Sequence, residues 1–339
     1  MSNNQLKEFD QELAQKHLVG YWNIAPREAY RKPNPSFEPH LWKWKDMAAA
    51  LDKAAEIIGP EDAFRRFIGF RNPSLKMGTA HTLLFGAQLV KPGEIAPAHR
   101  HTMGAIRFVV KGGGAQTTVN GEPFPMERGD LITTPNWTWH DHFNGSPNPV
   151  IWLDGADGPL IKFLEIGFGE PFRERQQALS RPVDSSRYEL GPARALWASS
   201  ASTQPPPYRY RWADTEHALN ALKGRPGDPF DGIPLRFVHP ITGGPTLPTL
   251  SCEMELLRPG EQTQSHRHTS SAVYHVFKGT GFTMIGDTRY EWEAGDTFVV
   301  PLWYWHHHGS GPHEESILFV MNDQPVIEAL GFYREEAAD

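Results

Sequence analysis

Residues 93–114 read GEIAPAHRHTMGAIRFVVKGGG, and residues 260–281 read GEQTQSHRHTSSAVYHVFKGTG. The two stretches align at an offset of 167 positions and share the motif HRHT. After a one-residue deletion the match resumes at an offset of 166, where GDLITTPNWTWHDH (129–142) aligns with GDTFVVPLWYWHHH (295–308). A repeat of this length is typical of a duplicated domain rather than of a short solenoid unit. We therefore expect two domains of similar build.

Each copy consists of short apolar runs separated by turn residues. In the first copy the runs are IRFVV (106–110), AQTTV (115–119) and LITTP (131–135). Asn120-Gly121, which follows the second run, is a strong hairpin signal. Short strands at this spacing predict a β-barrel or a β-sandwich, so the expected fold class is mainly β.

The segments outside the repeat differ in character. DMAAALDKAAEIIGP (46–60) predicts a helix that Gly59-Pro60 ends. The apolar face of this helix consists of Met47, Leu51, Ala54 and Ile58. We expect five segments: a helical N-terminal extension (1–75), a first domain (76–170), an inter-domain connection (171–235), a second domain (236–325) and a C-terminal helix or tail (326–339).

Composition excludes several classes of protein. The 339 residues carry a net charge of −7, which gives no attraction to nucleic acid or to anionic lipid. The sequence has neither a signal-peptide pattern nor an apolar run of the roughly 20 residues that a membrane helix needs. A single cysteine, Cys252, excludes an intramolecular disulfide and thiolate zinc clusters. We expect a soluble, cytoplasmic protein that binds neither nucleic acid nor membranes.

Histidines mark the candidate site. His99 and His101 are two apart on a predicted strand and therefore point to the same face, and His140 follows on a returning strand. Three imidazoles that converge inside a barrel can hold a divalent metal. A single HxH pair is more often an accident, but here the pair and its later histidine occur twice. The second copy repeats the pattern at His266, His268 and His306, which are the candidate ligands of a second metal site.

The motifs carry a resemblance to a known family. G-x5-H-x-H, followed by G-x5-P-x4-H-x3-N from Gly129 to Asn144, resembles the two cupin motifs. RRFIGFRNPSL, PAHRHTMGAIRFVVKG and TPNWTWHDH make the chain similar to the bicupin gentisate 1,2-dioxygenase family, over roughly residues 20–335. That family includes salicylate and 1-hydroxy-2-naphthoate dioxygenases. The resemblance implies two double-stranded β-helix (jelly-roll) barrels with a helical N-terminal segment, Fe(II) as cofactor, and a homo-oligomer, with a tetramer favoured.

One departure from the general cupin pattern bears on chemistry. Many cupins add a glutamate three or four residues after HxH, but the first copy has Ala105 and Ile106 there. Three histidines on a six-coordinate ion leave three open positions, two for a substrate's carboxylate and hydroxyl and one for dioxygen. Fe(II) is expected rather than zinc, because ring cleavage by dioxygen needs a redox-active ion.

Candidate substrate-positioning residues lie around the first histidine set. Arg107 shares strand parity with the histidines and is expected to orient the substrate carboxylate. The resemblance implies that His142 assists proton or oxygen handling and that Asp154 orients a neighbouring side chain. Other candidates for substrate contact are Gln88, Arg65, Arg66, Leu84 and Gly86. The sequence around Leu84 differs from that of many gentisate enzymes, which leaves salicylate-type or bicyclic substrates open.

The second copy keeps the histidines but changes their surroundings. Tyr274 stands where the first copy has Arg107, and Glu255 stands where it has Gln88. A negative Glu255 without the arginine disfavours an anionic substrate. We therefore predict that catalysis belongs to residues 93–154, and that the second site is a structural remnant with or without metal.

The predicted activity is Fe(II)-dependent cleavage of an aromatic ortho-hydroxycarboxylic acid by dioxygen. Gentisate, giving maleylpyruvate, is the first substrate expected, and salicylate, substituted salicylates and 1-hydroxy-2-naphthoate are alternatives. A metal-dependent isomerase or decarboxylase, or a non-catalytic ligand-binding bicupin, is the alternative of another class, because cupins host many functions.

Overall fold

A computed structural model describes residues 3–23, 32–59, 65–191, 195, 197 and 205–338. The chain divides into two compact units, Met1–Pro35 and Ser36–Asp339. The first unit contains α1 (Asn3–Gln15) and the short 3-10 helix η1 (Tyr21–Asn23). In this unit the ring of Phe9 stacks on that of Trp22, with 5.8 Å between the ring centroids.

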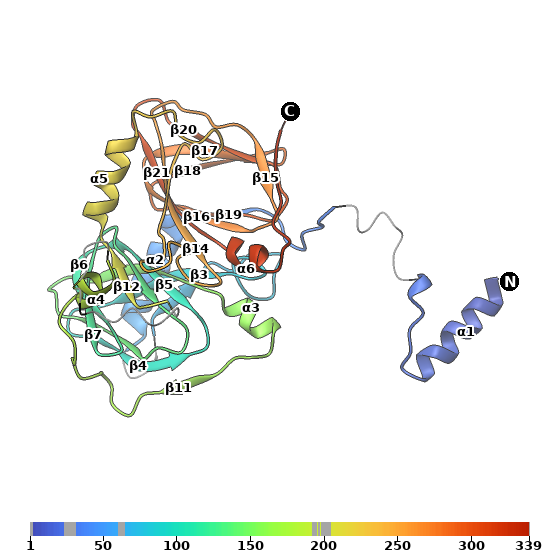
Figure 1. The fold of residues 1–339 in the computed structure, drawn as a ribbon, viewed down its shortest axis with the longest axis horizontal. Coiled ribbons are helices and arrows are strands. Elements are labelled where there is room, and N and C mark those ends of the chain that lie inside the picture. The colour runs from blue at the N-terminus through green and yellow to red at the C-terminus, as the bar shows by residue number, and fades with distance from the viewer. Residues whose placement is uncertain are drawn as a thin grey trace. The chain divides into compact units, whose positions relative to one another are not determined.

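The second unit contains two barrels, each built from two antiparallel sheets (Figure 1). The six-stranded sheet of the first barrel has the order β12 (Tyr208–Tyr210), β8 (Leu131–Thr134), β5 (Ala105–Lys111), β10 (Val150–Ala156), β3 (Leu84–Val90) and β2 (Phe67–Gly69). The five-stranded sheet has the order β11 (Gly169–Pro171), β4 (Ile95–His101), β9 (His140–Asn144), β6 (Gly113–Val119) and β7 (Glu122–Glu127).

The second barrel repeats this plan. Its six-stranded sheet has the order β1 (His40–Trp42), β19 (Thr297–Val300), β16 (Ala272–Lys278), β21 (Ser316–Asn322), β14 (Ser251–Leu257) and β13 (Ile233–Arg236). Its five-stranded sheet has the order β18 (Thr288–Glu293), β17 (Thr280–Ile285), β20 (His306–Ser310), β15 (His266–His268) and β22 (Glu335–Ala337). The mainly β, two-barrel fold expected from the repeat is confirmed.

Helices are short and lie outside the barrels (Figure 1). They are α2 (Trp44–Ile57), α3 (Gly158–Phe163), α4 (Ser185–Leu190), α5 (Trp212–Leu222) and α6 (Gln324–Ala329). The predicted helix over 46–60 corresponds to α2, which buries Met47, Leu51 and Ala54. Ile58 caps this helix with extended backbone and is not part of it. The predicted closing helix near the C-terminus is α6. Among the described residues, no helix has the length and apolar character needed to cross a bilayer.

The two barrels exchange strands. Strand β1 precedes the first barrel in sequence but pairs with β19 of the second, whereas β12 pairs with β8 of the first. The helix after each strand begins in the same way: the backbone N–H of Trp44 donates to Asp296, and that of Trp212 donates to Asp130. Each tryptophan packs on a glycine of the barrel that receives the strand. The segment before each barrel therefore helps to build the other one.

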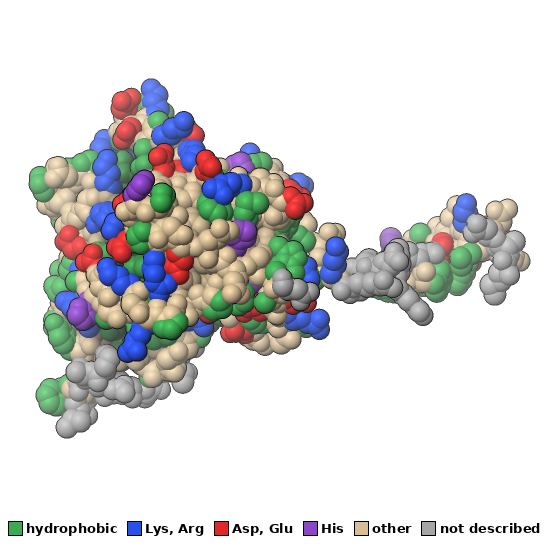
Figure 2. All heavy atoms as spheres, turned by 90° about the horizontal axis from the view of Figure 1, so that it is seen from above, with side chains coloured by type: hydrophobic (Ala, Val, Ile, Leu, Met, Phe, Trp, Pro, Cys, Tyr) green, Lys and Arg blue, Asp and Glu red, His purple; other side chains and the backbone are tan. Residues whose placement is uncertain are grey.

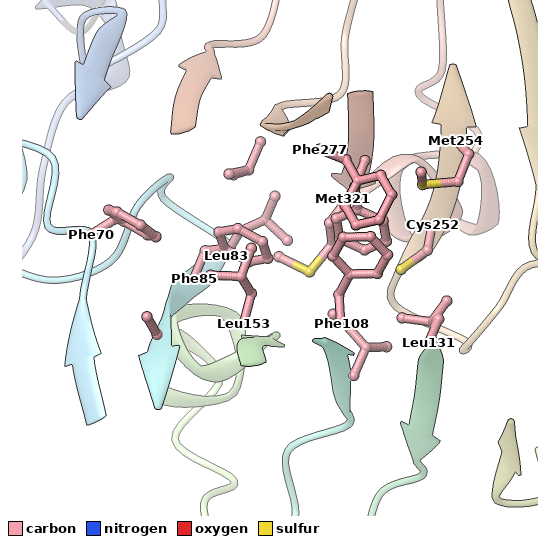
Figure 3. Close-up of a cluster of buried hydrophobic side chains, with 14 of the residues drawn as sticks. Phe70, Leu83, Phe85, Phe108, Leu131, Leu153, Cys252, Met254, Phe277 and Met321 are labelled. Carbon is pink, nitrogen blue, oxygen red and sulfur yellow. The ribbon is translucent and has the colours of Figure 1, made fainter. Parts of the chain in front are cut away.

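Alternation along the strands separates the barrel interiors from the interface. On β5, Val109 faces the core of the first barrel, and Phe108 faces the second barrel. The ring of Phe108 stacks on Phe319, with 4.2 Å between centroids, in an apolar cluster between the strands of the two barrels (Figure 3). Burial of this apolar cluster stabilises the pair of barrels, at roughly 25 cal/mol per Å² of apolar surface removed from water.

Two local features of the first barrel concern turns and edges. Asn120 and Gly121 have φ of 48° and 77°, the left-handed conformation that a tight hairpin between β6 and β7 requires. Strand β7, which contains Pro123 and Pro125, was not predicted as a strand. It lies at the edge of its sheet, where a missing N–H donor is tolerated. On the face in Figure 2, acidic and basic side chains are interspersed, and neither sign forms a continuous field.

Candidate active site

Three histidines converge at one end of the first barrel. His99 and His101 end β4, and His140 begins the neighbouring β9, directly opposite His99. The ring centroids of His99 and His140 are 4.3 Å apart, and those of His101 and His140 are 4.8 Å apart. One ligand atom from each of the three lies within 4.8 Å of the others. Strand pairing thus brings together His99 and His140, which are 41 positions apart in the sequence.

Backbone carbonyls fix the orientation of each ring. The Nδ1 atoms of His99, His101 and His140 lie 2.8, 2.9 and 3.0 Å from the carbonyl oxygens of Pro97, Met103 and Thr138, respectively. A carbonyl only accepts, so each Nδ1 carries the proton and each Nε2 keeps its lone pair.

The electrostatic environment keeps these rings neutral. Burial, then the nearby Arg65 guanidinium, lowers the pKa of His99 to about 3 and that of His101 to about 4. The pKa of His140 is also lowered well below its usual value, chiefly by burial. Neutral imidazole is the form that binds a metal, so the donor set fits a divalent cation.

Arg65 lies at the point on which the histidines converge. Its Nη2 lies 2.5 Å from Nε2 of His99 and 3.2 Å from Nε2 of His140. A guanidinium donates to the same lone pairs that a metal would use, so this point suits a positive charge. Burial lowers the pKa of Arg65 to about 10. Arg66 points elsewhere: it forms a buried ion pair with Glu94 and donates to the carbonyl of Ile58.

Arg107 is a fully buried cation beside the triad. It lies opposite Asp154 on β10, with 3.5 Å between its Nε and the Asp154 Oδ1. Its Nη1 donates to the Thr134 hydroxyl, whereas Nη2 has no hydrogen-bond partner among the described residues. Burial raises the pKa of Asp154, and Arg107 and Arg65 oppose that shift. A buried donor without a partner is costly, so Nη2 is a candidate contact for a ligand.

His142 links Arg107 to the strand behind it. Its Nε2 accepts a hydrogen bond of 3.2 Å from Arg107 Nε, and its Nδ1 lies 2.8 Å from the Thr117 hydroxyl. Burial and Arg107 lower the pKa of His142 well below its usual value. His142 is therefore a neutral acceptor rather than a fourth cation.

Strand β3 supplies the remaining predicted residues. Leu84, Gly86 and Gln88 alternate along it and share one face, and Asp154 lies directly opposite Gly86. Gln88 is fully buried, and neither atom of its amide has a hydrogen-bond partner among the described residues. A Cβ on Gly86 would lie 2.5 Å from the carbonyl oxygen of Ile68, so only glycine fits there.

Sequence analysis missed two polar residues of this site. Thr134 and Thr117 hold Arg107 and His142, respectively. A signal for Thr117 exists, because the repeat aligns it with Thr283, which contacts His308 in the same way at 2.9 Å. Thr134 has no such signal, because its counterpart in the second copy is Val300.

Comparisons with known proteins agree with this architecture. A cupin domain model matches residues 86–155 and 253–321. The chain is 42 % identical to 5-aminosalicylate 1,2-dioxygenase of Comamonas sp., over 96 % of this chain and 89 % of the relative. It is 37 % identical to gentisate 1,2-dioxygenase 1 of Aquipseudomonas alcaligenes, over 97 % and 95 %.

A solved structure extends the match to three dimensions. Salicylate 1,2-dioxygenase from Pseudoaminobacter salicylatoxidans, crystallised with gentisate, superposes with a TM-score of 0.91 at 32 % identity. The superposition covers 99 % of this chain and 95 % of that one. The bicupin fold is therefore confirmed. With these motifs, this fold and these relatives, the chain belongs to the gentisate 1,2-dioxygenase family of ring-cleaving bicupin dioxygenases.

Proposed function

We propose that the first barrel binds Fe(II) and cleaves the ring of an aromatic ortho-hydroxycarboxylic acid, between the carboxylated and the hydroxylated carbon. The observation that carries the proposal is the juxtaposition of a neutral three-histidine set with a buried arginine that has an unused donor. The first feature suits a divalent metal, and the second suits a carboxylate.

The proposed iron ligands are the Nε2 atoms of His99, His101 and His140. Bound Fe(II) supplies the redox chemistry that lets an aromatic acid react with dioxygen, which Zn²⁺ lacks. Three protein ligands leave coordination positions open, and no carboxylate of the chain belongs to this histidine set among the described residues. Arg65 now donates to two of these lone pairs, so it must turn aside when a metal binds.

Charge balance in this pocket supports an anionic substrate. Arg65 and Arg107 carry two positive charges, and Asp154 carries one opposing negative charge close to Arg107. The Nη2 donor of Arg107 gains a partner when a carboxylate binds, which removes an unsatisfied buried group. Arg107 thereby orients the acid, and Arg65 is the second cation available to it.

His142 is the proposed acceptor for the proton of the ring hydroxyl. In the structure its Nε2 lone pair is occupied by Arg107 Nε. When Arg107 turns its guanidinium edge toward the substrate carboxylate, this lone pair is released. Substrate binding and proton acceptance are then coupled through one arginine, while Thr117 keeps the imidazole in place.

Gentisate is the first substrate to test. It shares a salicylate skeleton with the substrates named for the Comamonas and Pseudoaminobacter enzymes, and differs from them at one ring position. Gln88, with two unpartnered amide atoms, and Leu84, half-buried on the same strand face, are proposed to line the ring pocket. The homo-oligomeric state and the cytoplasmic location expected from the sequence stay predictions.

Oxygen uptake by protein loaded anaerobically with Fe(II) tests this function. The panel is gentisate, salicylate, 5-aminosalicylate, 1-hydroxy-2-naphthoate, and catechol as a control without a carboxylate. We expect uptake with at least one hydroxy acid and none with catechol. No oxygen uptake with any compound of the panel, at full iron occupancy, would reject the proposal. Turnover without oxygen, in the presence of manganese or zinc, would instead support an isomerase or decarboxylase.

A further inference from the structure

The second barrel contains a second set of converging imidazoles. His266 faces His306 with 4.3 Å between ring centroids, and His268 lies 5.1 Å from His306. One ligand atom from each lies within 4.8 Å of the others. All three side chains are at least 91 % buried. The positions match those of the first barrel, but the groups around them do not.

Several buried polar atoms at this site have no hydrogen-bond partner among the described residues. They are the Nε2 atoms of His266, His306 and His308 and the Oε2 atom of Glu255. Glu255 is only 2 % exposed. Its carboxylate, the carboxylate of Asp231 and the imidazole of His308 form a group whose ligand atoms lie within 4.8 Å of one another. Orphaned buried acceptors cost free energy, and a cation between the imidazoles and the carboxylates would satisfy those of His266, His306 and Glu255.

Asp231 takes the place that Arg65 has in the first barrel. Arg65 lies two residues before β2, and Asp231 lies two residues before the equivalent β13. Arg65 places a guanidinium against Nε2 of His99, whereas Asp231 places Oδ1 3.7 Å from Nε2 of His266. Together with Glu255 in the place of Gln88, this substitution reverses the charge around the imidazoles.

We infer that the second barrel binds one first-row divalent cation through His266, His268 and His306, with Asp231 and Glu255 completing its coordination. Mixed imidazole and carboxylate donors suit Mn(II) and Fe(II), and five protein donors leave too few positions for both an aromatic acid and dioxygen. The carboxylates also repel a substrate anion. The site is therefore a structural cation site rather than a second catalytic centre.

The C-terminal strand belongs to this site. The Nδ1 of His266 lies 2.9 Å from Oε1 of Glu335 on β22, whereas the equivalent His99 uses a backbone carbonyl. A carboxylate behind a ligating imidazole fixes its tautomer and raises its basicity, and such partners change metal affinity about 10- to 100-fold. A cation bound here would also hold the tail strand against the barrel.

Mn(II) binding to the full-length, metal-stripped protein tests the inference. His101 and His268 are matched residues, because each Nδ1 lies 2.9 Å from a backbone carbonyl two residues later. Equilibrium dialysis with Mn(II), counted by electron paramagnetic resonance, is expected to show two equivalents per chain. His101→Ala and His268→Ala should each lose one equivalent. Mn(II) should still raise the melting temperature of His101→Ala, because its second barrel is intact.

A conservative variant separates the carboxylate contribution from folding defects. Glu255→Gln keeps the shape of the side chain but removes one carboxylate ligand. It is expected to raise the dissociation constant of the second Mn(II) at least tenfold, since loss even of a partner that only orients a ligand costs about 10- to 100-fold. Equal stoichiometry in His268→Ala and the wild type would overturn the second site. An unchanged dissociation constant in Glu255→Gln would overturn the five-donor coordination.

Discussion

The two barrels hold three imidazoles in closely similar arrangements and surround them with opposite charge. The separation of the paired rings is 4.3 Å in both, between His99 and His140 and between His266 and His306. Around the first set lie Arg65 and Arg107, and around the second lie carboxylates. The barrel therefore fixes where a metal can sit, and a few inward positions on other strands decide what can bind beside it.

The largest expected effect comes from removing one imidazole from each barrel in turn. His140→Ala should lower kcat for ring cleavage at least 10³-fold, because the proposed iron site loses a ligand. His306→Ala, the matched change, should lower it less than tenfold. Oxygen uptake together with iron content per chain measures both effects. Loss of turnover in His306→Ala, with iron content and stability unchanged, would mean that the barrels share the catalysis.

Arg107 and Tyr274 occupy matched positions and sharpen the comparison of charge. Arg107→Gln should reduce kcat/KM by about 100-fold, mainly through KM, because a charge-assisted contact to the carboxylate is lost. Iron content should not change. Tyr274→Phe should stay within about twofold of the wild type. Arg107→Gln leaves the buried carboxylate of Asp154 without its neighbouring cation. The double variant Arg107→Gln/Asp154→Asn removes that charge and is the control for this side effect.

If Arg107→Gln alone kept the kinetics of the wild type, the proposed carboxylate contact would be wrong. If it lost iron as well, Arg107 would instead support the metal site. The ratio of KM to kcat effects thus distinguishes binding of the acid from support of the metal.

A third pair concerns pH and the interface. His275 lies at the position of Phe108 and is 2 % exposed; burial, with Arg128 nearby, lowers its pKa to about 3. Below pH 6.5 the imidazole of His275 is protonated in the unfolded chain but stays neutral in the folded chain. The free energy of unfolding therefore decreases as pH falls. His275→Phe should remove about 2 kcal/mol of the decrease in unfolding free energy between pH 7 and pH 5.

Urea unfolding at both pH values measures this difference. The hydroxyl of Thr297 lies 3.1 Å from Nδ1 of His275 and loses this partner in His275→Phe. That loss costs the same free energy at both pH values, so it cancels when the two values are compared. An identical pH dependence in the variant and the wild type would show that His275 does not contribute to acid sensitivity.

The last comparison tests the symmetry of the contacts between the barrels. Asp157 accepts from Thr249 at 2.6 Å, and the equivalent Asp323 accepts from Thr82, so each barrel donates one hydroxyl to the other. Thr249→Val and Thr82→Val should each cost about 1.5 to 3 kcal/mol of unfolding free energy, the range for hydrogen bonds to a charged group. Thermal denaturation is sufficient to compare them. A loss near zero for one variant alone would show that its contact is dispensable.

Sequence alone predicts the two barrels, the histidine sets and Arg107, because these residues lie inside the repeated motifs, but it misses Thr134, which accepts from Arg107. It does not predict that Arg65 rather than Arg66 reaches the triad, since adjacent residues differ only in which way they face. Asp231 is outside the motifs, and its position depends on the pairing of β13 with β14. The tail residue Glu335 is likewise brought in by strand pairing alone.

The strand exchange has a weak signal that sequence analysis did not use. Trp44 and Trp212 match at an offset of 168, and each follows a basic residue. The strands themselves, His40–Trp42 and Tyr208–Tyr210, are three residues long, too short for an alternating pattern. Which barrel each strand joins is set by long-range packing that short patterns do not encode.

This exchange sets an order for biosynthesis. In the first barrel, Tyr208 follows its partner Thr133 by 75 positions, whereas in the second barrel Val299 follows its partner His40 by 259 positions. A ribosome that adds 5–20 residues per second makes β19 about 13 to 52 s after β1. Throughout that interval β1 is a strand without its partner, whereas the first barrel has all of its strands once β12 has been made, before β19 begins. The nascent chain therefore finishes its second barrel by returning to nearly the first strand that it made.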